Sequence, residues 1–238
     1  MTELPQAIFF DLDDTILAFT APAEPAWVEA TEGFTDSYGG VAATVVREAI
    51  HRIAGEWWSD AERHRLGRLD LRNTRIRNVA DALASLHILD DGLSTRMADT
   101  FARLRTEGLR LFPGARQTLE HFHEAGVPMA LLTNGDSAGQ RHKIERFDLA
   151  GFFDCILIEE EFGVGKPEEK VFRHALESLG STPDTTWMVG DNLHWEIGPC
   201  RRLGLHTIWV DFLGNGLPAD SAIEPHCTVQ SIHELIES

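Results

Sequence analysis

The sequence is poor in cysteine and in basic residues, and each shortage excludes a class of protein. Three cysteines, Cys155, Cys200 and Cys227, form an odd set without metal-ligand spacing, so we expect reduced thiols and no disulfide framework. Lysine and arginine number 21 against 38 acidic residues, for a formal net charge of −17. This acidity opposes binding to nucleic acid and to anionic membranes, because both would be repelled.

The chain also lacks long apolar runs. No run approaches the roughly 20 residues that a membrane span needs. The N-terminal sequence has neither the basic region nor the long apolar region of a signal peptide. We therefore expect a cytoplasmic protein without a membrane partner. No feature of the sequence specifies an oligomeric state.

An apolar segment that runs directly into two carboxylates is the most informative stretch present. Residues 8–10 are typical of a buried strand, and Asp11 and Asp13 follow at a spacing of two residues. Because alternate residues of a strand point the same way, we expect both carboxylates to converge on one substrate atom. Neighbouring carboxylates repel, so such a pair needs a cation or a proton between its members.

Two later segments place polar groups directly after an apolar run or inside a glycine-rich loop. Residues 127–132 predict a strand that ends in Thr133, Asn134 and Gly135, which offer a hydroxyl and free backbone amides. Lys166 lies between two glycines and a proline in a loop ahead of an expected helix.

A further expected strand, residues 187–189, ends in Gly190-Asp191-Asn192, and Glu196 follows five residues after the aspartate. Strand, loop and helix therefore alternate, as in proteins with a parallel sheet. We expect the remaining strands at 155–158, 206–210 and 227–229, and the remaining helices of this part at 139–147, 168–179 and 193–203. Ser231 and Glu234 have the spacing of a capping box at the start of a last helix.

These four segments, in this order, resemble the motifs of the haloacid dehalogenase-like hydrolase superfamily, and the resemblance covers nearly the whole chain. It implies an α/β fold with a Rossmann-like parallel sheet, helices on both faces and an inserted α-helical cap domain. Asp11 matches the nucleophile that forms an aspartyl-phosphate, and Asp13 matches the general acid and base. Asp13 favours phosphate chemistry over dehalogenation, because displacing a halide requires no proton for the leaving group.

The resemblance also assigns the phosphate and metal ligands. The residues implied for the phosphate are Thr133, Asn134, Gly135 and Lys166, of which Thr133 and Lys166 join Asp11 and Asp13 in the catalytic set. The residues implied for Mg²⁺ are Asp11, the backbone carbonyl of Asp13, and Asp191. Asn192 and Glu196 are expected to support the metal ligands.

Glu196 departs from the family, which usually has an aspartate there. We expect this carboxylate to bind a metal-bound water or to orient the ligands. Direct ligation of the metal and a solvated helix glutamate are the two alternatives.

The chain divides by composition into a catalytic core, residues 1–15 and 112–238, and a helical cap domain, residues 16–111. Helical periodicity in the cap predicts four helices, near 23–38, 41–58, 71–86 and 92–107, and no strands. A cap that covers the active site would exclude water and select the substrate.

The cap is rich in arginine. Arg68, Arg72 and Arg75 would share one face if they lay on a single helix, and could grip an anionic leaving group. A solvated face paired with nearby acidic side chains is the favoured interpretation of this cluster. For Trp57 and Trp58, packing in the cap core is favoured over stacking on a substrate.

The sequence thus predicts a magnesium-dependent phosphatase of a small phosphorylated metabolite. Three alternatives remain at this point: a phosphomutase with the same four motifs, a 2-haloacid dehalogenase, and a sensor that binds a phosphorylated metabolite without turnover. The motifs do not name the metabolite, because the cap decides it.

Overall fold

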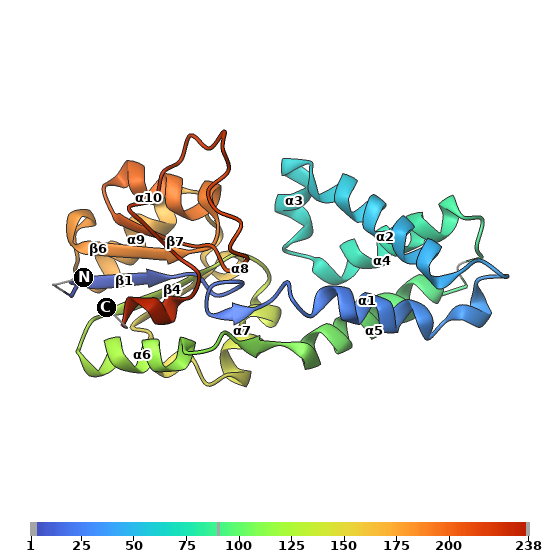
Figure 1. Cartoon of the computed structure of the whole chain (residues 1–238), viewed down its shortest axis with the longest axis horizontal. Coiled ribbons are helices and arrows are strands. Elements are labelled where there is room, and N and C mark those ends of the chain that lie inside the picture. Colours follow the sequence, from blue (N-terminus) through green and yellow to red (C-terminus); the bar gives the residue numbers. More distant parts are fainter. Residues whose placement is uncertain (1–3, 90, 237–238) are drawn as a thin grey trace. The chain divides into compact units, whose positions relative to one another are not determined.

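The computed structural model describes residues 4–89 and 91–236, which form two compact units (Figure 1). The first unit takes in the chain up to Ala18 and from Arg110 onward, and the second is Phe19–Leu109. The sequence predicted the boundaries between the two units at 15/16 and 111/112, and the structure has them at 18/19 and 109/110. Residues 1–3, on which part of the signal-peptide argument rests, lie outside the described residues.

A six-stranded sheet forms the middle of the first unit, and all its pairings are parallel. In sheet order the strands are β5 (Cys155–Ile158), β4 (Met129–Thr133), β1 (Ala7–Phe10), β6 (Thr186–Gly190), β7 (His206–Val210) and β8 (Cys227–Val229). The order reverses at β1, and ligands bind outside the carboxyl ends of the strands at such a switch point. The predicted Rossmann-like sheet is confirmed.

Helices cover both faces of this sheet. They are α6 (Ala115–Glu124), α7 (Ser137–Arg146), η2 (Ala150–Phe152), α8 (Glu159–Phe162), α9 (Glu169–Leu179), η3 (Pro183–Thr185), η4 (Leu193–Ile197), α10 (Gly198–Leu203) and η5 (Ile232–Leu235). Figure 1 shows α6 on one side of the strands and α9 and α10 on the other.

The two faces follow from the alternation of side chains along β1. Phe9 packs in one buried cluster with Phe172 of α9 and Cys200 of α10. Phe10 points to the opposite face, where its ring centroid lies 6.5 Å from that of Phe122 on α6. Since both faces are covered, the strand is apolar throughout.

The second unit is helical. Its elements are α1 (Ala23–Glu32), η1 (Thr35–Ser37), α2 (Ala43–Trp58), α3 (Ala61–Gly67), α4 (Leu71–Ser85) and α5 (Leu93–Gly108). The core between the four long helices contains Val46, Ile50, Val79, Leu83 and Met97. The apolar periodicity of those helices is therefore satisfied inside the unit.

Helix α3 is absent from the sequence prediction. It begins after Asp60, whose side chain accepts a hydrogen bond from the Arg63 amide at 2.8 Å, an N-cap that the arginine-rich composition obscured. Arg68 follows the end of α3, whereas Arg72 and Arg75 lie on α4. The alternative in which all three arginines share one helix face is therefore wrong, because they do not lie on a single helix.

Two short strands lie where the chain passes between the units. Leu17–Ala18 (β2) pairs antiparallel with Arg110–Leu111 (β3). The expectation of no strands in residues 16–111 is therefore wrong at both ends of that segment. Within residues 4–89 and 91–236, the structure has no helix long and apolar enough to cross a membrane.

Candidate active site

The carboxyl ends of three adjacent strands carry the predicted site residues. Asp11 is the first residue after β1, Thr133 is the last residue of β4, and Asp191 is the first residue after β6. Because β4, β1 and β6 are neighbours in a parallel sheet, their ends meet at one edge. Strand β1 ends at Phe10, so Asp11 and Asp13 lie in the loop and strand alternation does not align them.

Lys166 joins two carboxylates in the interior. Its Nζ lies 2.5 Å from Asp11 Oδ1 and 2.6 Å from Glu196 Oε1, and Lys166 and Glu196 are each only 2% exposed. Burial alone lowers the pKa of an ammonium group, but these two carboxylates raise the pKa of Lys166 overall. Lys166 therefore stays positively charged and restrains the Asp11 side chain.

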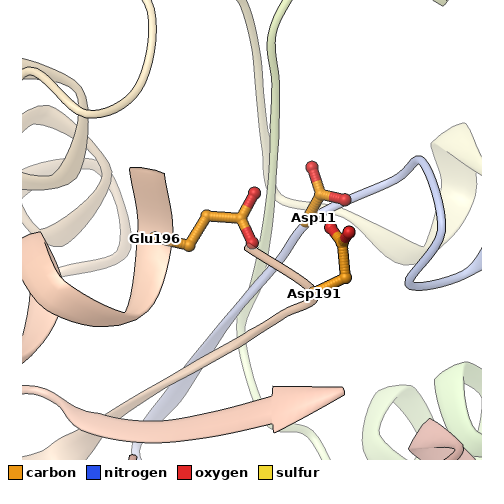
Figure 2. Close-up of side chains that lie close together, drawn as sticks. All are labelled: Asp11, Asp191 and Glu196. Carbon is orange, nitrogen blue, oxygen red and sulfur yellow. The ribbon is translucent and has the colours of Figure 1, made fainter. Parts of the chain in front are cut away.

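Asp11, Asp191 and Glu196 form a buried acidic cluster whose oxygens lie within 4.8 Å of one another. Figure 2 shows the three side chains converging from separate segments. Burial raises the pKa of Asp11 to about 8 and that of Asp191 to about 9, and the neighbouring carboxylates add to both shifts.

This cluster fits a divalent cation. With all three carboxylates ionised, the cluster would carry more negative charge than Lys166 offsets, which is why the pKa values of Asp11 and Asp191 are raised. A divalent cation would offset this charge and favour the ionised form of both groups. Carboxylate oxygens are hard ligands of the kind that Mg²⁺ binds, usually together with retained waters.

The Glu196 carboxylate is fixed by two hydrogen bonds. Oε1 accepts from Lys166 Nζ, and Oε2 accepts from the backbone amide of Asn192 at 3.0 Å. Asn192 also caps the turn that carries Glu196, because its Oδ1 accepts from the amides of His194 and Trp195. The alternative of a solvated helix glutamate is wrong, since the side chain is buried.

Two local features accompany the Glu196 carboxylate. The expected helix 193–203 begins as a single π-helical turn, η4, before α10 continues it. A Cβ at Gly190 would lie 2.0 Å from Glu196 Oε2, so only glycine allows the carboxylate to reach this place. Trp209 of β7 donates to the Asp191 carbonyl at 2.7 Å and holds the adjoining loop.

Asp13 has partners that the sequence did not reveal. Lys143 Nζ lies 2.8 and 2.6 Å from the two Asp13 oxygens, and Gln140 Nε2 donates to Asp13 Oδ2 at 3.3 Å. Both partners lie on the buried side of α7. A buried lysine and a buried glutamine on a helix are unusual, but their burial is a property of the fold, and no local pattern in the sequence singled them out.

Asn134 and Gly135 serve the loops around the site. The Asn134 side chain accepts from the Lys166 amide and donates to the Lys166 carbonyl, each at 2.8 Å. The Gly135 amide, expected to be free, donates to buried Glu159 at 3.0 Å, because a buried carboxylate needs donors. A Cβ at Gly165 would lie 2.5 Å from Asn134 Oδ1, so glycine there permits this close pairing of loops.

In the second unit, several arginines have local partners. Arg72 forms a bidentate ion pair with Asp99 at 2.9 and 2.8 Å, and both side chains are exposed. Arg63 and Arg77 lie over the Trp57 ring, 5.2 and 5.1 Å from its centroid. For Arg72 the solvated interpretation is therefore confirmed.

Comparison with known proteins supports the resemblance seen in the motifs. The model of the haloacid dehalogenase-like hydrolase family matches residues 5–204. A glyceraldehyde 3-phosphate phosphatase of Pyrococcus furiosus is 30% identical over 210 residues, which cover 87% of this chain and 81% of that protein. The pyrimidine 5'-nucleotidase YjjG of Escherichia coli is 29% identical over 233 residues, covering 96% and 95%.

Solved structures share the fold over nearly the full length. The HAD hydrolase YfnB of Bacillus subtilis superposes with a TM-score of 0.74 at 22% identity, covering 99% of this chain and 98% of that one. A 2-haloacid dehalogenase of Pseudomonas syringae superposes with a TM-score of 0.63 at 24% identity, covering 99% and 97%. The fold alone therefore does not separate hydrolysis of phosphate esters from dehalogenation, and the side chains must decide.

Proposed function

The chain belongs to the haloacid dehalogenase-like hydrolase family, and from that premise we propose that it is a magnesium-dependent phosphatase of a small phosphorylated metabolite. One observation carries the proposal. Asp11 is a buried carboxylate at the switch point of the sheet, bonded to Lys166 and placed beside a second acidic group, Asp191. That arrangement combines a nucleophile with the ligands of a divalent cation.

Asp11, Asp191 and the backbone carbonyl of Asp13 would hold the Mg²⁺. When bound, the ion supplies positive charge that lets the phosphate dianion enter a field of carboxylates. Glu196 would act from behind these ligands, because both of its oxygens are already hydrogen-bonded to Lys166 and to the Asn192 amide. We therefore prefer a supporting role for Glu196 over direct ligation.

Asp11 and Asp13 would share the chemistry. An Asp11 oxygen attacks phosphorus, forming the aspartyl-phosphate while the bond to the leaving oxygen breaks. Asp13, then protonated, gives that oxygen its proton, and afterwards takes a proton from the water that hydrolyses the acyl-phosphate. Lys143 and Gln140 orient the Asp13 side chain for both transfers.

The remaining predicted residues would bind or support the phosphate. Thr133 would donate its hydroxyl to a phosphate oxygen, and Lys166 would offset the charge that develops on the transferring group. Asn134 would act through Lys166, whose backbone it holds, and Gly135 would act through the loop of Glu159. We therefore assign these two residues to positioning.

Asp13 also separates the alternatives. A dehalogenase needs no acid for its leaving group, so an aspartate held by Lys143 has no use in that reaction. The relatives named as phosphatases act on different phosphate esters. This favours the phosphatase class for the chain, and the helical unit would then select the metabolite. A phosphomutase would require a bisphosphate, and a sensor would bind an ester without turnover.

The testing experiment is phosphate release from a panel of phosphorylated metabolites, with Mg²⁺ and with excess chelator. The native chain is compared with Asp11→Asn, which keeps the side-chain shape but removes the nucleophile. Turnover that needs both Mg²⁺ and Asp11 supports the proposal. Bisphosphate-dependent isomerisation, halide release from a 2-haloacid, or ester binding without release would each replace it.

A further inference from the structure

One peptide group of the candidate active site is held at both of its ends. It joins Asp191 to Asn192, in the loop between β6 and η4. Its carbonyl accepts a hydrogen bond from Trp209 Nε1 at 2.7 Å, and its N–H donates to Glu196 Oε2 at 3.0 Å. Two side chains from different elements, β7 and η4, therefore fix the plane of this peptide group.

The parallel pairing of β6 with β7 brings Trp209 to this place. Trp209 is the cross-strand partner of Gly190, the residue before Asp191. Paired residues of neighbouring parallel strands direct their side chains to the same face of the sheet. Glu196 Oε2 lies on that face too, 2.0 Å from the point where a Gly190 Cβ would be. The indole and the Glu196 carboxylate thus approach the peptide group from one face.

The hydrogen bond from Trp209 is buried and has one direction. Trp209 is only 8% exposed, and an indole offers a single N–H donor and no acceptor. A buried indole N–H needs an acceptor, and here the acceptor is the Asp191 carbonyl. Without this donor the carbonyl could turn. Because a peptide group is planar, its N–H would turn as well, away from Glu196.

The peptide group also connects Trp209 to the proposed nucleophile. Beyond it, Glu196 Oε1 accepts from Lys166 Nζ at 2.6 Å, and Lys166 Nζ donates to Asp11 Oδ1 at 2.5 Å. Hydrogen bonds at the two ends of one peptide group polarise and strengthen each other away from water. The orientation of this group therefore affects all three carboxylates of the acidic cluster, Asp191 and Glu196 directly and Asp11 through Lys166.

We propose, building on the magnesium-dependent function proposed above, that Trp209 is a positioning residue of the metal site. It holds the Asp191–Asn192 peptide group, and through that group it keeps the Asp191 and Glu196 side chains in the arrangement that binds Mg²⁺. Trp209 has no oxygen ligand to offer the ion, so its effect is indirect.

Trp209→Phe tests this role, because phenylalanine keeps an aromatic ring but has no N–H. Mg²⁺ binding to the full chain is measured by calorimetry and by the Mg²⁺-induced rise in Tm. We expect the Kd for Mg²⁺ to be about tenfold higher in the variant, the lower end of the range for residues that support metal ligands. Trp187→Phe is the matched control, because the Trp187 ring contacts Phe122 and His206 and should leave the Kd unchanged.

The response to Mg²⁺ separates positioning from a purely structural role. A structural loss lowers the Tm of Trp209→Phe equally in Mg²⁺ and in excess chelator and leaves the Kd for Mg²⁺ at its native value. That result overturns the proposal. A loss of Tm that is larger in Mg²⁺ than in chelator, together with a higher Kd, supports it.

A measurement on the native chain decides if Trp209→Phe does not fold. The indole N–H signals of the six tryptophans are followed by ¹H–¹⁵N NMR during a Mg²⁺ titration. The Trp209 signal should move with the Kd found by calorimetry, because its acceptor belongs to Asp191, and the Trp187 signal should stay in place. A Trp209 signal that does not respond to bound Mg²⁺ overturns the proposal.

Failure of this inference is distinguishable from failure of the phosphatase proposal. Mg²⁺-dependent phosphate release by the native chain, with equal Mg²⁺ affinity in Trp209→Phe, overturns the role of Trp209 alone. Weaker Mg²⁺ binding in Trp209→Phe, with no phosphate release from any ester by the native chain, overturns the phosphatase function alone. A native chain that does not bind Mg²⁺ overturns both.

Discussion

Replacing Glu196 by glutamine tests the proposed metal site most directly. The carboxylate accepts two hydrogen bonds, from Lys166 Nζ at 2.6 Å and from the Asn192 amide at 3.0 Å. An amide has one oxygen, so it satisfies only one of these donors and turns its NH₂ group toward the other. The substitution also removes one negative charge from a cluster of three carboxylates.

The expected loss of Mg²⁺ affinity follows from substitutions of residues that hydrogen-bond metal ligands in other proteins. Such substitutions weaken metal affinity or activity by about 10 to 100-fold. At a Mg²⁺ concentration of 100 times the native Kd, binding stabilises the native chain by about 2.7 kcal/mol. A site tenfold weaker keeps about 1.4 kcal/mol, and a site hundredfold weaker keeps about 0.4 kcal/mol. For a chain of this size, the Mg²⁺-induced rise in Tm should therefore be smaller by about 3 to 9 °C.

The assay is thermal unfolding of both proteins over a Mg²⁺ titration, together with the Mg²⁺ dependence of phosphate release. Glu177→Gln is the control, because Glu177 is exposed on α9 and its loss changes the net charge equally. A Glu196→Gln protein with the native Mg²⁺ response would refute the reasoning. It would mean that the buried carboxylate serves Lys166 only.

Three further predictions concern other groups. Asp11→Asn should lower phosphate release by roughly 10⁴-fold or more without loss of helical circular dichroism, and retained turnover would exclude Asp11 as the nucleophile. Lys143→Met should lower kcat by roughly 10 to 100-fold with little change in KM, because Asp13 loses the cation that orients it. Lys143→Arg should restore part of the lost kcat. A native kcat in Lys143→Met would mean that Lys143 has a structural role only. Burial lowers the pKa of His226, whose Nδ1 accepts from the Thr207 amide at 3.0 Å, so the contribution of His226 to stability should fall as the pH drops below about 6.5. The raised pKa values of Asp11 and Asp191 act in the opposite direction over this range, so the quantity to measure is the difference in stability between the native chain and His226→Asn, by urea unfolding between pH 5 and 8. A difference that does not change with pH would disprove the prediction.

The order of the elements and the strands that carry the site follow from local sequence. Alternating apolar runs and polar loops predicted β5, β7 and β8 at the residues where they occur. The capping box of Ser231 and Glu234 is also present at the start of η5. Such features depend on residues a few positions apart, so periodicity and turn chemistry are enough to predict them.

Contacts between distant segments could not be predicted in this way. Lys143 and Asp13 are separated by 130 positions, and Lys166 and Asp11 by 155. Which lysine meets which aspartate depends on how α7 and the loop before α9 pack against the sheet. Composition suggested a solvated arginine face, and the structure supports that for Arg72 but places Arg75 in a cavity wall.

By itself, the sequence determined the α/β class, the four motifs at the strand ends and the acidic character of the site, because these depend on residue type and short spacing. Only the tertiary structure decided that Glu196 is buried beside Lys166, that the Gly135 amide donates to Glu159, and that Asn78 Oδ1 is buried with no hydrogen-bond partner among the described residues. The physical reason is that burial and hydrogen-bond partners are properties of packed neighbours, and packing brings together side chains that no local pattern connects.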